Sequence, residues 1–187
     1  LWDHQQIVEG LAMVEVALRH HRPGPYQIQA AIAALHVEPA TAAETDWRQI
    51  AILYNELSRY LSNPIVTLNH AVAVAMAVSP DAGLRLIEES TLRKSLAGHH
   101  VFHAALADLL CRAEREAEAA AAYQEALGLC RNAVETRYLQ RQLASLASSC
   151  LLYTSDAADD LLCVDLGGRR IIKKNKTIFT LTLHPRH

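Results

Sequence analysis

Residues 62–81 read SNPIVTLNHAVAVAMAVSPD, and this stretch decides the fold. Between its two proline-containing breaks, the segment 65–78 is apolar on nearly every side of a helix. A helix that is apolar all round is normally buried by neighbours on all sides. Ser62-Asn63-Pro64 ends the preceding helix and Ser79-Pro80-Asp81 begins the next one, because proline cannot continue the hydrogen-bond ladder. The stretch therefore predicts a central helix of an all-α domain.

Further helical segments flank this central one on both sides. Upstream, apolar periodicity predicts helices over residues 3–21, 25–36 and from Thr45 to the break at Ser62, with Thr45 as an N-cap. Downstream, it predicts helices over residues 80–89, 98–112 and 115–130 and from about residue 133. About eight helices joined mostly by short turns, with no convincing strand, predict antiparallel neighbours packed as hairpins.

Composition narrows the classes of function. Residues 1–149 hold 12 Lys and Arg against 16 Asp and Glu, with no basic patch, so we expect no nucleic-acid-binding face within them. No apolar run reaches the roughly 18 residues that span a bilayer, and no signal peptide opens the chain. We therefore expect a cytoplasmic protein without membrane contact. Leu1 is not a start methionine, so we also expect the sequence to begin inside a longer protein.

Residues 150–187 differ in character from the helical region. The stretch from Cys150 to Asp160 resembles one reading frame of a sequencing-library adapter, and Val164–Ile172 resembles the same frame near the adapter's far end. Two such blocks in the right order predict a non-native tail, although Thr177–Leu183 also alternates partly like a strand. We therefore divide the chain into a helical-repeat domain at 1–149 and an adapter-derived tail at 150–187.

Two cysteines remain in the helical domain. Cys111 and Cys130 are expected near opposite ends of one helical hairpin, which is too far apart for a disulfide. We predict buried free thiols in a reducing cytosol.

Small residues recur at a spacing typical of helical repeats. Ala71 and Ala107 are 36 residues apart, and Ala82 and Ala119 are 37 apart, against about 34 in tetratricopeptide repeats. Two local motifs, from Trp47 to Tyr54 and from Ala119 to Ala126, agree with such repeats, but the two do not share one register. We predict tetratricopeptide-like stacked hairpins, an α-solenoid, and leave open an Ala-rich bundle without repeat geometry. The residues expected to pack the repeats are Trp47, Ala51, Tyr54, Ala71, Ala107, Ala119, Tyr123 and Ala126.

The helical domain carries no recognisable catalytic signature. Its five glycines are scattered, so no phosphate-cradling loop is expected, and no nucleophile motif appears. His99, His100 and His103 cluster at one helix start, but without a zinc-binding motif we interpret them as ordinary polar groups and predict no metal. We expect a protein that is not an enzyme and uses no cofactor.

The segment 22–29, RPGPYQIQ, is the best candidate for contact with a partner. Gln27 and Gln29 lie on an otherwise apolar helix, where their amides can bond a partner's backbone. Solvent exposure, or capping of a neighbouring loop, is the simpler explanation of both side chains, and the two interpretations stay open.

Three stretches in this order resemble one known group: residues 22–36 (RPGPYQIQAAIAALH), 45–54 (TDWRQIAILY) and 63–75 (NPIVTLNHAVAVA). The group is the bacterial sigma factors of the extracytoplasmic-function type that carry a long C-terminal tetratricopeptide-like extension. Residues 105–110 and 119–127 continue the likeness, which covers nearly all of residues 1–149.

The resemblance implies a regulatory extension that supports transcription initiation in a full-length sigma factor. Its partner would be a protein: its own sigma modules, core RNA polymerase or a signalling protein. DNA would be reached only through modules upstream of Leu1. The candidate contact and motif residues are Arg22, Tyr26, Gln27, Gln29 and Asn69. The alternative is a free-standing tetratricopeptide-like adaptor unrelated to transcription.

Overall fold

The computed structural model describes residues 9, 12 and 16 and the segments 24–37 and 44–148. Within these residues every regular element is helical, which confirms the all-α prediction. The first predicted helix lies largely outside the described residues, and so do Arg22 and the predicted tail. The eight helices are α2 (Pro25–Val37), α3 (Trp47–Tyr60), α4 (Pro64–Ala77), α5 (Pro80–Glu89), α6 (Leu92–Ser95), α7 (His100–Arg112), α8 (Glu116–Leu129) and α9 (Ala133–Ser148).

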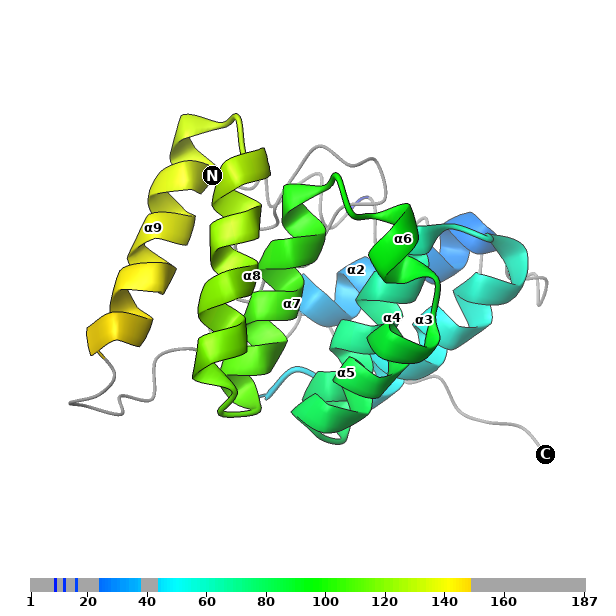
Figure 1. The fold of residues 1–187 in the computed structure, drawn as a ribbon. Coiled ribbons are helices and arrows are strands. Elements are labelled where there is room, and N and C mark those ends of the chain that lie inside the picture. The colour runs from blue at the N-terminus through cyan, green and yellow to red at the C-terminus, as the bar shows by residue number, and fades with distance from the viewer. Residues whose placement is uncertain (1–8, 10–11, 13–15, 17–23, 38–43, 149–187) are drawn as a thin grey trace.

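The helices pack largely in chain order, as a solenoid-like stack of hairpins. Each long helix contacts the next one: α2 packs on α3, α3 on α4, α4 on α5, α5 on α7, α7 on α8 and α8 on α9. In Figure 1 they lie side by side from α2 and α3 at one end to α9 at the other. Such an arrangement follows from short connections, because each turn returns the chain alongside the helix it has just left.

Local capping explains where the helices begin. Asn63 accepts a hydrogen bond from the Ile65 amide at 2.9 Å, and Ser79 accepts one from the Ala82 amide at 3.2 Å. Each cap is followed directly by a proline, whose missing N–H costs nothing in the first turn. At α3 the predicted cap was wrong by one residue. Asp46, not Thr45, accepts from the Gln49 amide at 2.9 Å.

The short helix α6 was not predicted. It lies between α5 and α7, where Leu92 and Leu96 are buried against the core. Four residues make barely one turn, so no apolar periodicity is long enough to reveal such a helix in the sequence.

Helix α4 belongs to two hydrophobic clusters at once. Its Val66 and Ala73 pack with residues of α2 and α3, including Ile32, Ile50 and Leu57. Its other buried apolar side chains join a larger cluster that extends through α5 and α7 to α9 and includes Leu68, Ala71, Val72 and Ala75. This double role is the physical reason why the segment 65–78 is apolar on nearly every side.

The α4–α5 and α7–α8 hairpins share a repeat period of 36 residues. α4 and α7 begin at residues 64 and 100, and α5 and α8 begin at residues 80 and 116. The same offset relates Ala71 to Ala107 and Gly83 to Ala119, and all four residues are buried. Pairing Ala82 with Ala119 was therefore wrong by one residue. Gly83 is the small residue at the α4–α5 crossing, whereas Ala82 is only half-buried.

A polar pair is enclosed within the α7–α8 hairpin. The Tyr123 hydroxyl of α8 donates a hydrogen bond to Asp108 Oδ1 of α7, while the Tyr123 side chain is 1% exposed. Burial and the neighbouring Asp108 carboxylate both raise the pKa of the Tyr123 phenol, so Tyr123 stays a neutral donor. This hydrogen bond joins α7 to α8 at a position where packed helices usually contact each other through apolar atoms.

The two cysteines are free thiols, but both are half-buried instead of fully buried. Cys111 lies near the end of α7 and Cys130 follows the end of α8, as their predicted separation requires. Burial, with a smaller contribution from Asp108, raises the pKa of the Cys111 thiol to about 11.

This pKa predicts slow alkylation of Cys111. Near pH 8 we expect iodoacetamide to modify Cys111 about 100-fold more slowly in the folded chain than in urea, because the thiolate fraction falls tenfold for each unit above the ordinary value of 9.0. Peptide mass spectrometry of timed samples measures this ratio. Equal rates in the two conditions would contradict it.

Among the described helices, none combines the length and the apolar character needed to cross a bilayer.

Candidate functional site

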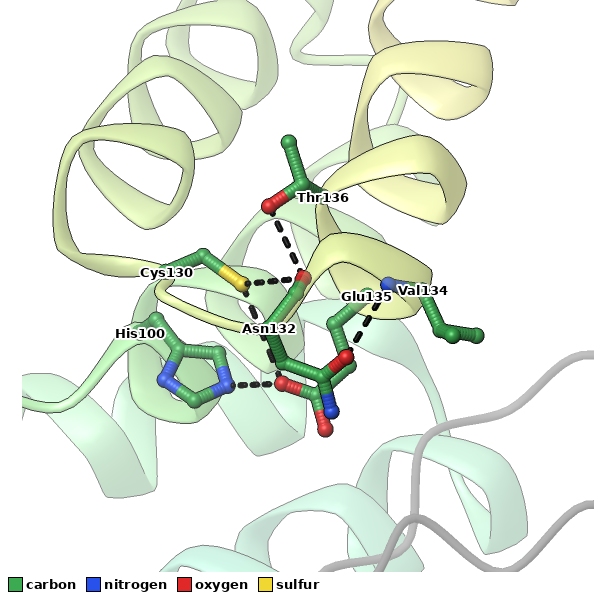
Figure 2. A network of polar contacts seen from close by, with 6 residues as sticks. All are labelled: His100, Cys130, Asn132, Val134, Glu135 and Thr136. Carbon is green, nitrogen blue, oxygen red and sulfur yellow. Dashed lines mark hydrogen bonds and ion pairs between the residues drawn. The ribbon is translucent and has the colours of Figure 1, made fainter.

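Three side chains with metal-ligating atoms converge at one end of the α7–α8–α9 layer. His100 is the first residue of α7, Cys130 follows the last residue of α8, and Glu135 lies in the first turn of α9. Because α7 and α8 are antiparallel, the start of one lies beside the end of the other, and α9 begins at the same end. Figure 2 shows the three side chains directed toward one another.

The Glu135 carboxylate is the centre of this cluster. Its Oε2 atom lies 2.8 Å from His100 Nε2 and 3.8 Å from Cys130 Sγ. The three ligand atoms all lie within 4.8 Å of one another. The His100 and Glu135 side chains are 28% and 22% exposed, so water and ions reach the cluster from one side.

A hydrogen-bond network around Asn132 fixes the chain that carries Cys130 and Glu135. The Asn132 side chain accepts from the Val134 amide at 2.9 Å and so caps the start of α9. The backbone carbonyl oxygen of Asn132 accepts from the Thr136 amide and hydroxyl, and the Cys130 thiol lies 3.6 Å from that same backbone oxygen. These contacts, which Figure 2 draws except for the Thr136 amide bond, fix the conformation of the short α8–α9 connection.

The cluster has two chemical capabilities. As it stands, the hydrogen bond between His100 and Glu135 joins α7 to α9, which are far apart in sequence. A nitrogen, a sulfur and a carboxylate oxygen are also the donor atoms with which proteins bind zinc. Among the described residues, these three side chains are close enough together for their ligand atoms to share one metal ion.

The neighbouring histidines do not join the cluster. His103 Nε2 contacts the Ala97 carbonyl oxygen at 2.8 Å, and its ring packs edge-on against Phe102. His99 is exposed and precedes α7. Of the three clustered histidines, His100 is therefore the one that the fold brings beside other metal-ligating side chains.

The candidate partner-contact residues differ widely in exposure. Tyr26 is 80% exposed in the first turn of α2, and Gln29 is half-buried. The Gln27 side chain accepts a hydrogen bond from the Gly24 amide at 3.0 Å, so it caps its own helix. Asn69 is only 3% exposed, inside α4, and the structure does not bring it to the surface that carries Tyr26.

The residues expected to pack the repeats lie in the two hydrophobic clusters. Trp47, Ala51 and Tyr54 belong to the cluster of α2, α3 and α4, where the Trp47 ring meets the His36 ring edge-on at 5.3 Å. The remaining ones are all buried in the larger cluster: Ala71, Ala107, Ala119, Tyr123 and Ala126.

Sequence reasoning missed the His100–Cys130–Glu135 cluster because its members are not close in sequence. One signal was available. An antiparallel hairpin places its first and last residues together, so His100 and Cys130 could have been paired across the predicted helices 98–112 and 115–130. Glu135, early in the next helix, completes the group.

Comparison with known proteins identifies a relative in Rhizobium meliloti (strain 1021), a protein described as uncharacterized. The two are 45% identical over 148 residues, which are 79% of this chain and 34% of the relative. The chain thus spans about a third of the length of the protein it matches. No family model matches the chain, and no solved structure matches it.

Proposed function

We propose that this chain is a regulatory protein-interaction extension of an alternative bacterial RNA polymerase sigma factor. The observation that carries the proposal is the ordered series of motifs at residues 22–36, 45–54 and 63–75, which resembles that group. In this proposal the extension catalyses no reaction, works in the cytoplasm and reaches DNA only through the sigma modules.

Two further observations support the proposal. Stacked helical hairpins present extended surfaces that commonly bind other proteins. The relative is also about three times as long as the matched region, so in that protein this domain accompanies a larger amount of other sequence.

The direct test uses the full-length Rhizobium meliloti relative. We expect it to co-elute with purified core RNA polymerase on gel filtration and to direct transcription from promoters in a reconstituted reaction. If it neither binds core polymerase nor supports initiation, the sigma-factor proposal fails, and the free-standing adaptor takes its place.

We propose that Tyr26 contacts the protein partner of this extension. It is the most exposed of the large apolar side chains of α2–α9, and it lies within the first motif. An exposed tyrosine can supply a large contact area at low entropic cost, which is why tyrosine is common among binding hot spots.

An excess of this chain is expected to inhibit transcription by the reconstituted relative, because the two would compete for one docking surface. Tyr26→Ala should weaken this inhibition at least about tenfold without changing the fold. The matched control is Tyr60→Ala, which removes a 48% exposed tyrosine at the end of α3. Equal potency of the two variants would exclude Tyr26 from the contact.

A further inference from the structure

We propose that His100, Cys130 and Glu135 form a Zn²⁺ site that joins α9 to the α7–α8 hairpin, with water as the fourth ligand. The inference is independent of the proposed function, because it depends only on the geometry of these three side chains. Neither the motifs nor the relative assigns such a site.

The chemistry of the donor atoms selects the metal. Ca²⁺ and Mg²⁺ prefer sets of oxygen ligands, whereas a thiolate and an imidazole favour zinc and similar softer ions. A carboxylate completes a ligand set that tetrahedral Zn²⁺ accepts readily. Three protein ligands leave one position open, and the partial exposure of His100 and Glu135 gives water access to it.

The distances are close to those of a tetrahedral site. Zinc bonds of about 2.0 Å to nitrogen and oxygen and about 2.3 Å to sulfur place the nitrogen and oxygen about 3.3 Å apart and the sulfur about 3.5 Å from each. The 3.8 Å between Cys130 Sγ and Glu135 Oε2 is about 0.3 Å longer than this spacing. The 2.8 Å between His100 Nε2 and Glu135 Oε2 must lengthen by about half an ångström. His100 Nε2 and Cys130 Sγ lie within 4.8 Å of each other, against about 3.5 Å for a nitrogen and a sulfur on one zinc ion.

Binding has a defined proton balance. The Cys130 thiol gives its proton to solvent and binds Zn²⁺ as a thiolate. A neutral His100 moves its ring proton to Nδ1, so that the Nε2 lone pair faces the metal. The Nε2–H···Oε2 hydrogen bond is replaced by two metal–ligand bonds, and each zinc ion bound to the neutral thiol releases one proton.

The site would act on the last described helix of the stack. On its inner side, α9 is held by the buried Leu139 and the half-buried Tyr138, Leu143 and Leu146. A metal that bridges Glu135 to His100 and Cys130 adds a second attachment at the start of α9. Metal binding and the docking of α9 are therefore coupled, since anything that binds only the docked form stabilises it.

The experiment uses the full chain in a Cys150→Ser/Cys163→Ser background, which leaves Cys111 and Cys130 as its thiols. The metal-free protein is titrated with Co²⁺, whose thiolate charge-transfer band reports a sulfur ligand directly, and Zn²⁺ is then added in competition. We expect one equivalent of metal and a band that Zn²⁺ removes. Thermal unfolding with and without Zn²⁺ should show a rise in Tm.

Variants locate the site. Removing an outer-shell partner of a metal ligand already costs about 10–100-fold in affinity, so Cys130→Ser, His100→Gln and Glu135→Gln should each weaken Zn²⁺ binding by more than about tenfold. The controls are Cys111→Ser, at the opposite end of α7, and His103→Gln, one turn from His100, and both should bind like the parent. Circular dichroism of each metal-free variant verifies the fold.

The Co²⁺ titrations of the parent and of the two cysteine variants give results that either support or overturn the site. Loss of the Co²⁺ band in Cys130→Ser, with retention in Cys111→Ser, supports the site. Absence of the band from the parent, its persistence in Cys130→Ser, or its equal loss in both cysteine variants would overturn the proposal. If Glu135→Gln does not fold, Cys130→Ser still decides, because it replaces a single half-buried sulfur with oxygen.

Discussion

Replacing Gly83 with alanine is expected to lower the free energy of unfolding by about 2 kcal/mol. A Cβ at this position would lie 2.5 Å from Ala75 Cβ and 2.6 Å from the Ala71 carbonyl oxygen. Neither atom belongs to a flexible side chain, so α5 must move away from α4. Overpacking of this kind costs up to about 3 kcal/mol, and the better helix propensity of alanine returns about 1 kcal/mol.

Gly128→Ala is the matched control, because Gly128 also lies in a helix but a Cβ added there would meet nothing within 4 Å. The same substitution at this position should stabilise the chain by about 0.4–1 kcal/mol. Urea unfolding followed by circular dichroism measures both variants. Stabilisation by both would show that α4 and α5 do not approach as closely as described.

Tyr123→Ala is expected to destabilise the chain by about 3–5 kcal/mol, the largest effect of any single substitution considered. The side chain is 1% exposed and is among the largest fully buried side chains of the described residues. Its removal leaves a cavity between α7 and α8 and also deletes the hydrogen bond to Asp108. Such a loss is a large part of the stability of a domain of this size.

Tyr123→Phe separates the two contributions. Phenylalanine keeps the ring but removes the hydroxyl donor, and losing a hydrogen bond to a carboxylate costs about 1.5–3 kcal/mol. The same urea unfolding curves give both values, and a double-mutant cycle with Asp108→Ala, which removes the acceptor, isolates the coupling between the pair. A Tyr123→Phe variant as stable as the parent would show that the hydroxyl contributes nothing to stability.

The sequence predicted the fold well where local chemistry decides it. Proline after a capping residue marks the starts of α4 and α5, and the apolar segment 65–78 is the central helix. The 36-residue offset between Ala71 and Ala107 also revealed the relation between two hairpins.

Two of the errors have a common physical cause: they concern contacts between helices. Choosing Gly83 over Ala82 requires knowing which side of α5 faces α4, and one residue on a helix is a rotation of about 100°. The His100–Cys130–Glu135 cluster likewise depends on three helix ends meeting. Capping by Asp46 instead of Thr45 is a local error, since both side chains are capable of accepting the bond.

Because α4 contributes to both hydrophobic clusters, neither cluster can be opened without exposing one of its faces. Backbone amides of α4 should therefore exchange with deuterium only when the whole domain unfolds, and their protection should report global stability. Amides of α9, which packs mainly on α8 at one end of the stack, should exchange through local opening. The stack would then lose structure from its α9 end inward, with α4 as its last ordered element.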